Sequence, residues 1–307
     1  MADFSGTPLS GNSPLSVTFT DLSTNTPTGW AWEKNDGGGW AAFSGTPTAQ
    51  NPTESFGDGT WSVRLAASNA GGSDSETKAD YVESLHVFTP GDLASLVRAV
   101  VAEGQAYSDT DPVGLATGAY GTGEDFTASG STRPTFSANA TPAGTAAFDF
   151  DGTDDRLDFT STGALTQWHL FFVIKFDVTT GTHAYISGPN SNIFGVVQSD
   201  AATSDQAIDN AVGSIPALVY GGSPKDTDWH LVEFIYDGAT MTAVRDGVTL
   251  DTDAASGSYT FSALADWAAG GAAFNGKVAE ALVCNAPVTG GDLTNVRSYL
   301  TAQHLTP

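Results

Sequence analysis

The chain has 307 residues, of which 35 are glycine, 14 are proline and only 15% are charged. That profile is typical of many short strands joined by turns and unlike that of a long-helix protein. A formal net charge of −24 disfavours nucleic-acid and anionic-membrane partners, because both kinds of binding depend on lysine and arginine. No apolar run approaches the length of a membrane span, and the single cysteine, Cys284, has no partner for an intrachain disulfide.

Residues 1–85 contain short segments in which apolar and polar side chains alternate, at 15–20, 30–32 and 61–66. Alternation with a period of two places one set of side chains in a core and the other in solvent. Turn-rich stretches separate these segments. The pattern therefore predicts several short strands that form a small immunoglobulin-like β-sandwich.

This part of the chain has four tryptophans, and aromatic rings of this kind form stacking platforms for sugars. The alternation instead places Trp32 and Trp61 in the core of the sandwich. Trp40 directly follows three glycines, and both burial and exposure stay open for it. We therefore retain Trp40 as a candidate ligand-binding residue.

A series of motifs runs through the same segment, at residues 2–5, 13–23, 30–32, 51–53, 67–74 and 78–82. In this order they resemble a PKD domain, and the resemblance covers nearly the whole of residues 1–85. One motif departs from the family pattern. An Asp-Phe-Gly-Asp-Gly turn is usual after the second tryptophan, and Glu33-Lys-Asn-Asp-Gly37 stands there instead. The resemblance implies a spacer or interaction module and no catalysis.

A helix is predicted to begin at Thr89. Threonine is a favoured N-cap, Pro90 suits the first helical position, and Asp92 complements the positive end of the helix dipole. The apolar residues that follow recur at the spacing of one helix face, at Leu93, Leu96, Val97, Val100 and Val101. A second domain is expected over residues 86–307, and this helix lies near its start.

Strand patterns return after the predicted helix. Residues 168–176 are apolar on both sides, which predicts a mid-sheet strand with both faces covered. Residues 229–250 alternate and contain Asp-Gly turns, which indicate consecutive hairpins. Further strands are expected at 146–150 and 276–284, and a short helix is expected at 292–300.

Together these segments resemble the concanavalin A-like, or laminin-G-like, jelly roll over nearly all of residues 90–305. The features that carry the resemblance are 133–136 leading into 148–157, the hairpin at 245–247, the strand at 276–284 and the helix at 293–300. The expected fold class is therefore all-β. It combines a small Ig-like β-sandwich over 1–85 with a larger concanavalin A-like jelly-roll sandwich over 86–307 and short flanking helices. This scaffold hosts lectins, glycanases and structural domains, so the resemblance indicates the fold rather than the function.

The sequence predicts no catalytic residues. A retaining glycanase on this scaffold needs two facing carboxylates, and Glu233 and Glu280 stand singly among apolar residues. The histidines are scattered without a zinc-binding pair, and nucleophile-elbow and Walker motifs do not occur. Cys284 ends an apolar strand, as a buried hydrophobic residue would. We expect a protein that is not an enzyme.

Two kinds of ligand site have candidates. Asp151, Asp154 and Asp155 belong to an acidic cluster with the oxygen ligands that calcium prefers, although their spacing is not that of an EF-hand. No cofactor is expected, and calcium at these three residues is the alternative. The candidates for glycan binding in a concave groove are the aromatic residues Trp40, Tyr220 and Trp267.

Both resembled families work outside cells, yet the N-terminus has no secretory signal pattern. The first module starts almost at Met1, so we expect a complete gene product that is made in a cytoplasm and released by lysis. This predicts a virion surface protein of a bacteriophage-like particle: a capsid decoration, a head spike or a tail-associated subunit. Its expected partners are other virion subunits, further copies of itself and host cell-surface polysaccharide. The alternatives are a dedicated carbohydrate-binding lectin and the adhesion module of a secreted, extracellular bacterial protein.

Overall fold

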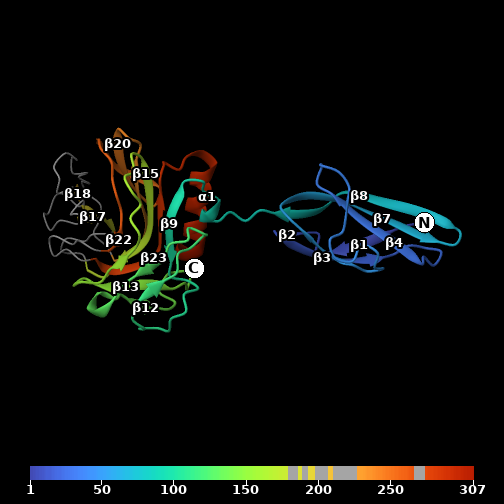
Figure 1. Cartoon of the computed structure of the whole chain (residues 1–307), viewed down its shortest axis with the longest axis horizontal. Helices are drawn as coiled ribbons and strands as arrows, with labels where there is room; N and C mark the ends of the chain where they lie inside the picture. The colour runs from blue at the N-terminus through green and yellow to red at the C-terminus, as the bar shows by residue number, and fades with distance from the viewer. Residues whose placement is uncertain (179–185, 189–192, 198–206, 210–226, 266–273) are drawn as a thin grey trace. The chain divides into compact units, whose positions relative to one another are not determined.

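The computed structural model describes residues 1–178, 186–188, 193–197, 207–209, 227–265 and 274–307. It divides the chain into two compact units, Met1–Val87 and Phe88–Pro307. Strands dominate both units, as Figure 1 shows, and the expected all-β class is confirmed. Among the described residues, no helix is long and apolar enough to cross a membrane.

Unit 1, residues 1–87, contains two sheets. The first has the strand order β1 (Phe4–Thr7), β3 (Leu15–Asp21) and β6 (Thr53–Phe56). The second has the order β2 (Ser10–Asn12), β8 (Gly72–Leu85), β7 (Gly59–Asn69), β4 (Gly29–Asn35) and β5 (Ala41–Ala42). Along β3 the residues are alternately buried and exposed, as the period of two predicts.

An aromatic cluster forms the core of unit 1. Phe4, Phe19 and Trp32 are fully buried, and the centroids of their rings lie between 5.2 Å and 6.1 Å apart. Tilted and edge-on contacts of this kind stabilise a core beyond the area that they bury. The prediction for Trp32 is confirmed. Trp61 lies half-buried and packs against this core, on the same face of β7 as Val63 and Leu65.

The described residues of unit 2, which spans 88–307, form two larger sheets (Figure 1). The eight-stranded sheet has the order β12 (Thr135–Ser137), β13 (Ala147–Asp151), β23 (Asn275–Cys284), β15 (Trp168–Phe176), β19 (Trp229–Tyr236), β20 (Thr240–Arg245) and β21 (Val248–Ala254), with β9 (Leu96–Val101) also paired to β23. The seven-stranded sheet has the order β10 (Leu115–Ala116), β11 (Phe126–Thr127), β14 (Leu157–Asp158), β22 (Ala263–Leu264), β16 (Ile186–Ser187), β17 (Ile193–Val197) and β18 (Ala207–Asp209). A 3₁₀ turn, Gly130–Thr132, precedes β12.

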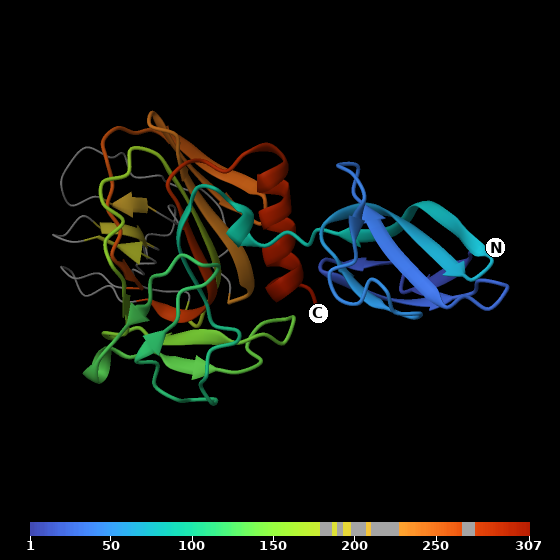
Figure 2. The same ribbon diagram turned by 45° about the vertical axis from the view of Figure 1, so that its right-hand side comes forward.

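Both faces of the eight-stranded sheet are covered. Phe172 of β15 belongs to the core shared with the seven-stranded sheet, whereas Phe171 packs into a second core beneath helix α1 (Gly290–Leu300). A π-helical turn, Thr301–Leu305, follows α1, and Figure 2 shows the helix lying along the sheet. The predicted mid-sheet strand, the hairpins of β19, β20 and β21, and the C-terminal helix are thus confirmed.

The helix predicted from Thr89 is wrong beyond its first turn. A single 3₁₀ turn, Pro90–Asp92, is present, and the Asp92 carboxylate accepts the backbone N–H of Thr89 at 2.7 Å. The chain then forms β9, which pairs with β23. Val100 faces the core between the sheets and Ala99 faces the core beneath α1. A short strand that is buried on both faces loses the period of two, and its apolar residues then match a helix face equally well.

Candidate functional sites

Trp40 lies half-buried just before β5, and its ring is held against a charged side chain. The guanidinium carbon of Arg64 lies 4.5 Å from the centroid of the Trp40 ring. Arg64, on β7, is also ion-paired with Glu33, its cross-strand partner on β4. A guanidinium that a carboxylate fixes in this way stacks on an aromatic ring and holds the orientation of that ring. We call these three side chains the Trp40 stack.

The outward face of the five-stranded sheet carries small side chains beside the Trp40 stack. The successive rows across β4, β7 and β8 are Glu33–Arg64–Thr77, Ala31–Ala66–Ser75 and Gly29–Ser68–Ser73. The alternate positions on β4 and β7, Trp32 and Leu65, point into the core and are fully buried. One side of the Trp40 stack is therefore bordered by an open part of the sheet that carries small side chains.

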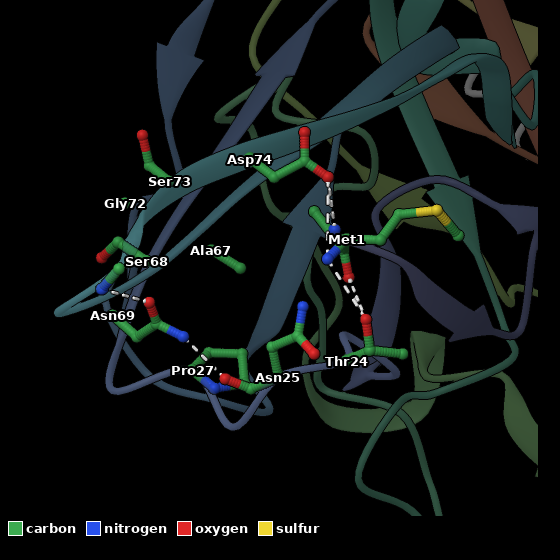
Figure 3. Close-up of a pocket in the computed structure, with 12 residues that line it drawn as sticks. Met1, Thr24, Asn25, Pro27, Ala67, Ser68, Asn69, Gly72, Ser73 and Asp74 are labelled. Atoms are coloured by element: carbon green, nitrogen blue, oxygen red, sulfur yellow. Dashed lines mark hydrogen bonds and ion pairs between the residues drawn. The ribbon is translucent and has the colours of Figure 1, made fainter.

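A pocket of about 340 Å³ lies at the end of unit 1 where β7 turns into β8 (Figure 3). Its walls come from residues 1–2, from residues 24–27 between β3 and β4, and from residues 67–74 of the β7–β8 hairpin. Polar side chains and backbone groups make up much of this lining. The sequence does not reveal the pocket, because its walls are brought together only by the folding of the unit.

The three aspartates that are candidate calcium ligands lie together. One carboxylate oxygen from each of Asp151, Asp154 and Asp155 lies within 4.8 Å of the others. Asp155 is only 5% exposed and accepts the backbone N–H of Asp151 at 2.9 Å. Burial, together with the charges of the neighbouring aspartates, raises the pKa of Asp155 to about 6. The cluster has the type of donor atom that calcium prefers, and calcium binding there stays a prediction.

The other two candidates for glycan binding, Tyr220 and Trp267, lie outside the described residues. Cys284 is buried in β23, and burial raises the pKa of its thiol to about 12. A thiol in that state is a poor nucleophile at neutral pH, as expected for a residue of the hydrophobic core.

Glu233 lies on the sheet face that α1 covers and is completely buried. Arg297 of α1 donates two hydrogen bonds to its carboxylate, from Nε at 2.8 Å and from Nη2 at 3.0 Å. The buried His169 places Nε2 3.1 Å from the same carboxylate. The backbone N–H of Val288 is donated to Nδ1 of His169, so Nε2 carries the proton of a neutral imidazole. Burial lowers the pKa of His169 and favours this neutral form.

Glu280 is enclosed in a similar network on the same sheet face. Nε2 of the buried His304 lies 2.7 Å from one carboxylate oxygen, and Tyr120 donates its hydroxyl to the other oxygen at 2.7 Å. Thr145 Oγ1 lies 2.8 Å from Nδ1 of His304. We call the networks around Glu233 and Glu280 the α1 clamp, because they tie β19 and β23 to α1 and to the turn that follows it. Both glutamates are engaged in holding the fold.

No family model matches the sequence, and no curated protein does. Among solved structures, domain 4 of AbnA, a GH43 extracellular arabinanase from Geobacillus stearothermophilus in complex with arabinotriose, is similar over 66% of this chain and 97% of that chain, with 12% identity and a TM-score of 0.44. A Trypanosoma rangeli sialidase in complex with sialic acid is similar over 99% of this chain and 54% of that chain, with 10% identity and a TM-score of 0.42. Scores this low carry no implication for function, and the PKD and jelly-roll resemblances stay predictions.

Proposed function

We propose that the chain is a non-catalytic carbohydrate-binding protein that attaches to a surface glycan through unit 1. The observation that carries this proposal is the Trp40 stack at the border of the open sheet face. Arg64 holds the Trp40 ring from one side, so the ring is oriented before a ligand arrives. A preorganised aromatic ring suits the apolar face of a sugar, and the neighbouring hydroxyl groups of Ser75 and Thr77 suit its polar edge.

The lack of catalysis is part of the proposal. A retaining glycosidase needs two carboxyl groups about 5 to 5.5 Å apart on either side of the scissile bond. Within the described part of the chain, Glu233 and Glu280 are buried and are bonded to Arg297 and His304. Neither carboxylate is open to a polysaccharide. We expect no reducing sugar to be released from any glycan that the protein binds, and a reducing-end assay checks this.

A glycan array that is probed with the full chain and with Trp40→Ala tests the binding site. We expect at least one glycan to bind, and its apparent affinity to fall roughly fivefold to tenfold in the variant. An aromatic stacking contact contributes about 1 to 1.5 kcal/mol, which corresponds to that change. Trp40→Phe keeps a ring in place and should lose less affinity than Trp40→Ala.

Trp30→Phe is the matched control, because Trp30 is a half-buried tryptophan of the same unit that lies outside the Trp40 stack. It should bind as the unaltered chain does. The proposal is wrong if no glycan binds, or if Trp40→Ala and Trp30→Phe bind equally well.

A finer prediction concerns where the protein presents this site, on a virion or as a secreted adhesin. The sequence favours a virion, with other virion subunits and copies of the chain itself as partners, over a secreted extracellular adhesin. Quantitative mass spectrometry of purified particles would find the chain in a fixed ratio to the capsid protein in the first case. Recovery of the chain from the medium of cells that make no particles would support the adhesin instead.

A further inference from the structure

We infer that the pocket where β7 turns into β8 binds one residue of a neutral sugar, as a site separate from the Trp40 stack. Its volume of about 340 Å³ lies in the range of small-ligand sites. Figure 3 shows polar side chains around it, with Asp74 at the top, Asn69 at the left, and Thr24 and Asn25 at the bottom. The inference goes beyond the proposed function, because other residues would hold this ligand.

Hydrogen bonds tie the walls of the pocket together. Asn69 donates its side-chain amide to the carbonyl of Asn25 at 2.6 Å and accepts the backbone N–H of Gly71 at 2.8 Å. Ala2 donates its backbone N–H to the carboxylate of Asp74 at 2.8 Å. The N-terminal segment, the loop before β4 and the hairpin thus hold one another in place. A cavity that is formed in advance costs a ligand less ordering entropy on binding.

The exposed side chain of Asn25 can reach a ligand in the pocket. Its amide makes no hydrogen bond to any described residue, and Figure 3 draws none from it. Asn25 and Thr26 both adopt left-handed backbone conformations, with φ of 65° and 47°. Thr26 is β-branched, and such a residue adopts this conformation only where the surrounding structure holds it. The loop therefore presents at the pocket an amide that can donate to one sugar hydroxyl and accept from another.

The charges at the pocket indicate the class of sugar. The backbone N–H groups of Ala2 and Ser75 lower the pKa of Asp74, which is therefore ionised at neutral pH. No lysine or arginine lines the pocket. An anionic sugar would therefore meet the Asp74 carboxylate and no basic side chain there, in a chain of net charge −24. A neutral hexose or N-acetylhexosamine is the expected ligand.

Saturation-transfer difference NMR on the full chain tests the inference, with D-glucose, D-galactose, N-acetyl-D-glucosamine and the anionic D-glucuronate as probes. At least one neutral probe should bind with a dissociation constant on the order of 1 mM, as a ligand of about a dozen non-hydrogen atoms does. Glucuronate should give no signal. Asn25→Gly removes the amide and keeps the left-handed backbone, and it should weaken binding roughly tenfold.

Asn139→Gly is the matched control, since Asn139 is an exposed asparagine of unit 2 with a φ of 51°. It should bind the probe unchanged, and thermal unfolding verifies that each variant folds. Trp40→Ala separates this site from the proposed function, because monosaccharide binding should persist in it. The inference is overturned if every neutral probe is silent, if Asn25→Gly binds as well as Asn139→Gly, or if Trp40→Ala abolishes the signal.

Discussion

The buried acidic residues of this protein differ mainly in the side chains that surround their carboxylates. Glu233 is 0% exposed and Asp155 is 5% exposed, so both carboxylates have lost most of their hydration. Arg297 compensates the first with two hydrogen bonds. Asp155 faces Asp151 and Asp154 instead. The first carboxylate is therefore paired within the fold, whereas the second is costly as an anion unless a proton or a cation joins it.

Asp155 should make the fold less stable as the pH rises. Its pKa is raised from 3.8 to about 6 in the folded chain, so the folded state holds the proton more tightly. The stability that this gives is present in full below about pH 4 and is lost as the pH rises through about 6. A shift of this size corresponds to at most about 3 kcal/mol. Urea unfolding at pH 4 and pH 8 should show a smaller loss for Asp155→Asn than for the unaltered chain, and an equal loss would contradict this account.

Calcium should relieve the same repulsion. At pH 7.5 the ion would match the charges of Asp151, Asp154 and Asp155, and it would bind the folded chain in preference to the unfolded one. At a concentration about a hundredfold above the dissociation constant, the midpoint of thermal unfolding should rise by roughly 5 to 10 °C. Asp154→Ala should lose this rise. The same rise with sodium chloride of matched ionic strength would mean screening rather than binding.

At the scale of elements, pairing with a neighbouring strand decides whether a segment becomes a strand or a helix when its local sequence pattern fits both. Residues 96–101 have the apolar spacing of a helix face, yet they form β9 because the edge of β23 offers a ladder to pair with. Helix α1 formed where it was predicted, and the α1 clamp now explains how it is attached to the sheet. Contacts between elements therefore decide both that residues 96–101 form a strand and how α1 is held against the sheet.

Glu233→Ala should loosen the attachment of α1. The variant leaves the guanidinium of Arg297 and the ring of His169 without their buried carboxylate, and breaking a buried pair of this kind costs about 3 to 5 kcal/mol. Glu124→Ala is the control, since its carboxylate lies 3.8 Å from Arg98 in a partly exposed pair that should contribute at most about 1 kcal/mol. The free energy of unfolding in urea compares the two. Similar losses would mean that the clamp does not hold the helix.

At the scale of the whole molecule, the two compact units have separate cores. The aromatic core around Phe19 belongs to residues 1–87, and the cores on the two faces of β15 belong to residues 88–307. A core that one unit completes by itself can melt as a cooperative block of its own. The stability of each unit should therefore respond to substitutions in that unit.

Phe19→Ala should lower one thermal transition and leave the other in place. Both Phe19 in unit 1 and Phe172 in unit 2 are buried, and each truncation to alanine should cost about 3 to 5 kcal/mol. Scanning calorimetry should show that Phe172→Ala moves the transition that Phe19→Ala leaves unchanged. A single transition that both variants lower together would show that the units unfold as one.

The sequence by itself determined the all-β class, the inward position of Trp32, the doubly covered strand at 168–176 and the C-terminal helix. These follow from the period and length of apolar segments, which neighbouring residues set. Only the tertiary structure decided that residues 96–101 pair as a strand, that Arg64 holds the ring of Trp40, and that the solitary Glu233 and Glu280 are clamped to α1 and the turn after it. It also formed the pocket beside Asn25. Each of these features depends on residues far apart in the chain, whose contacts arise only when the sheets pack.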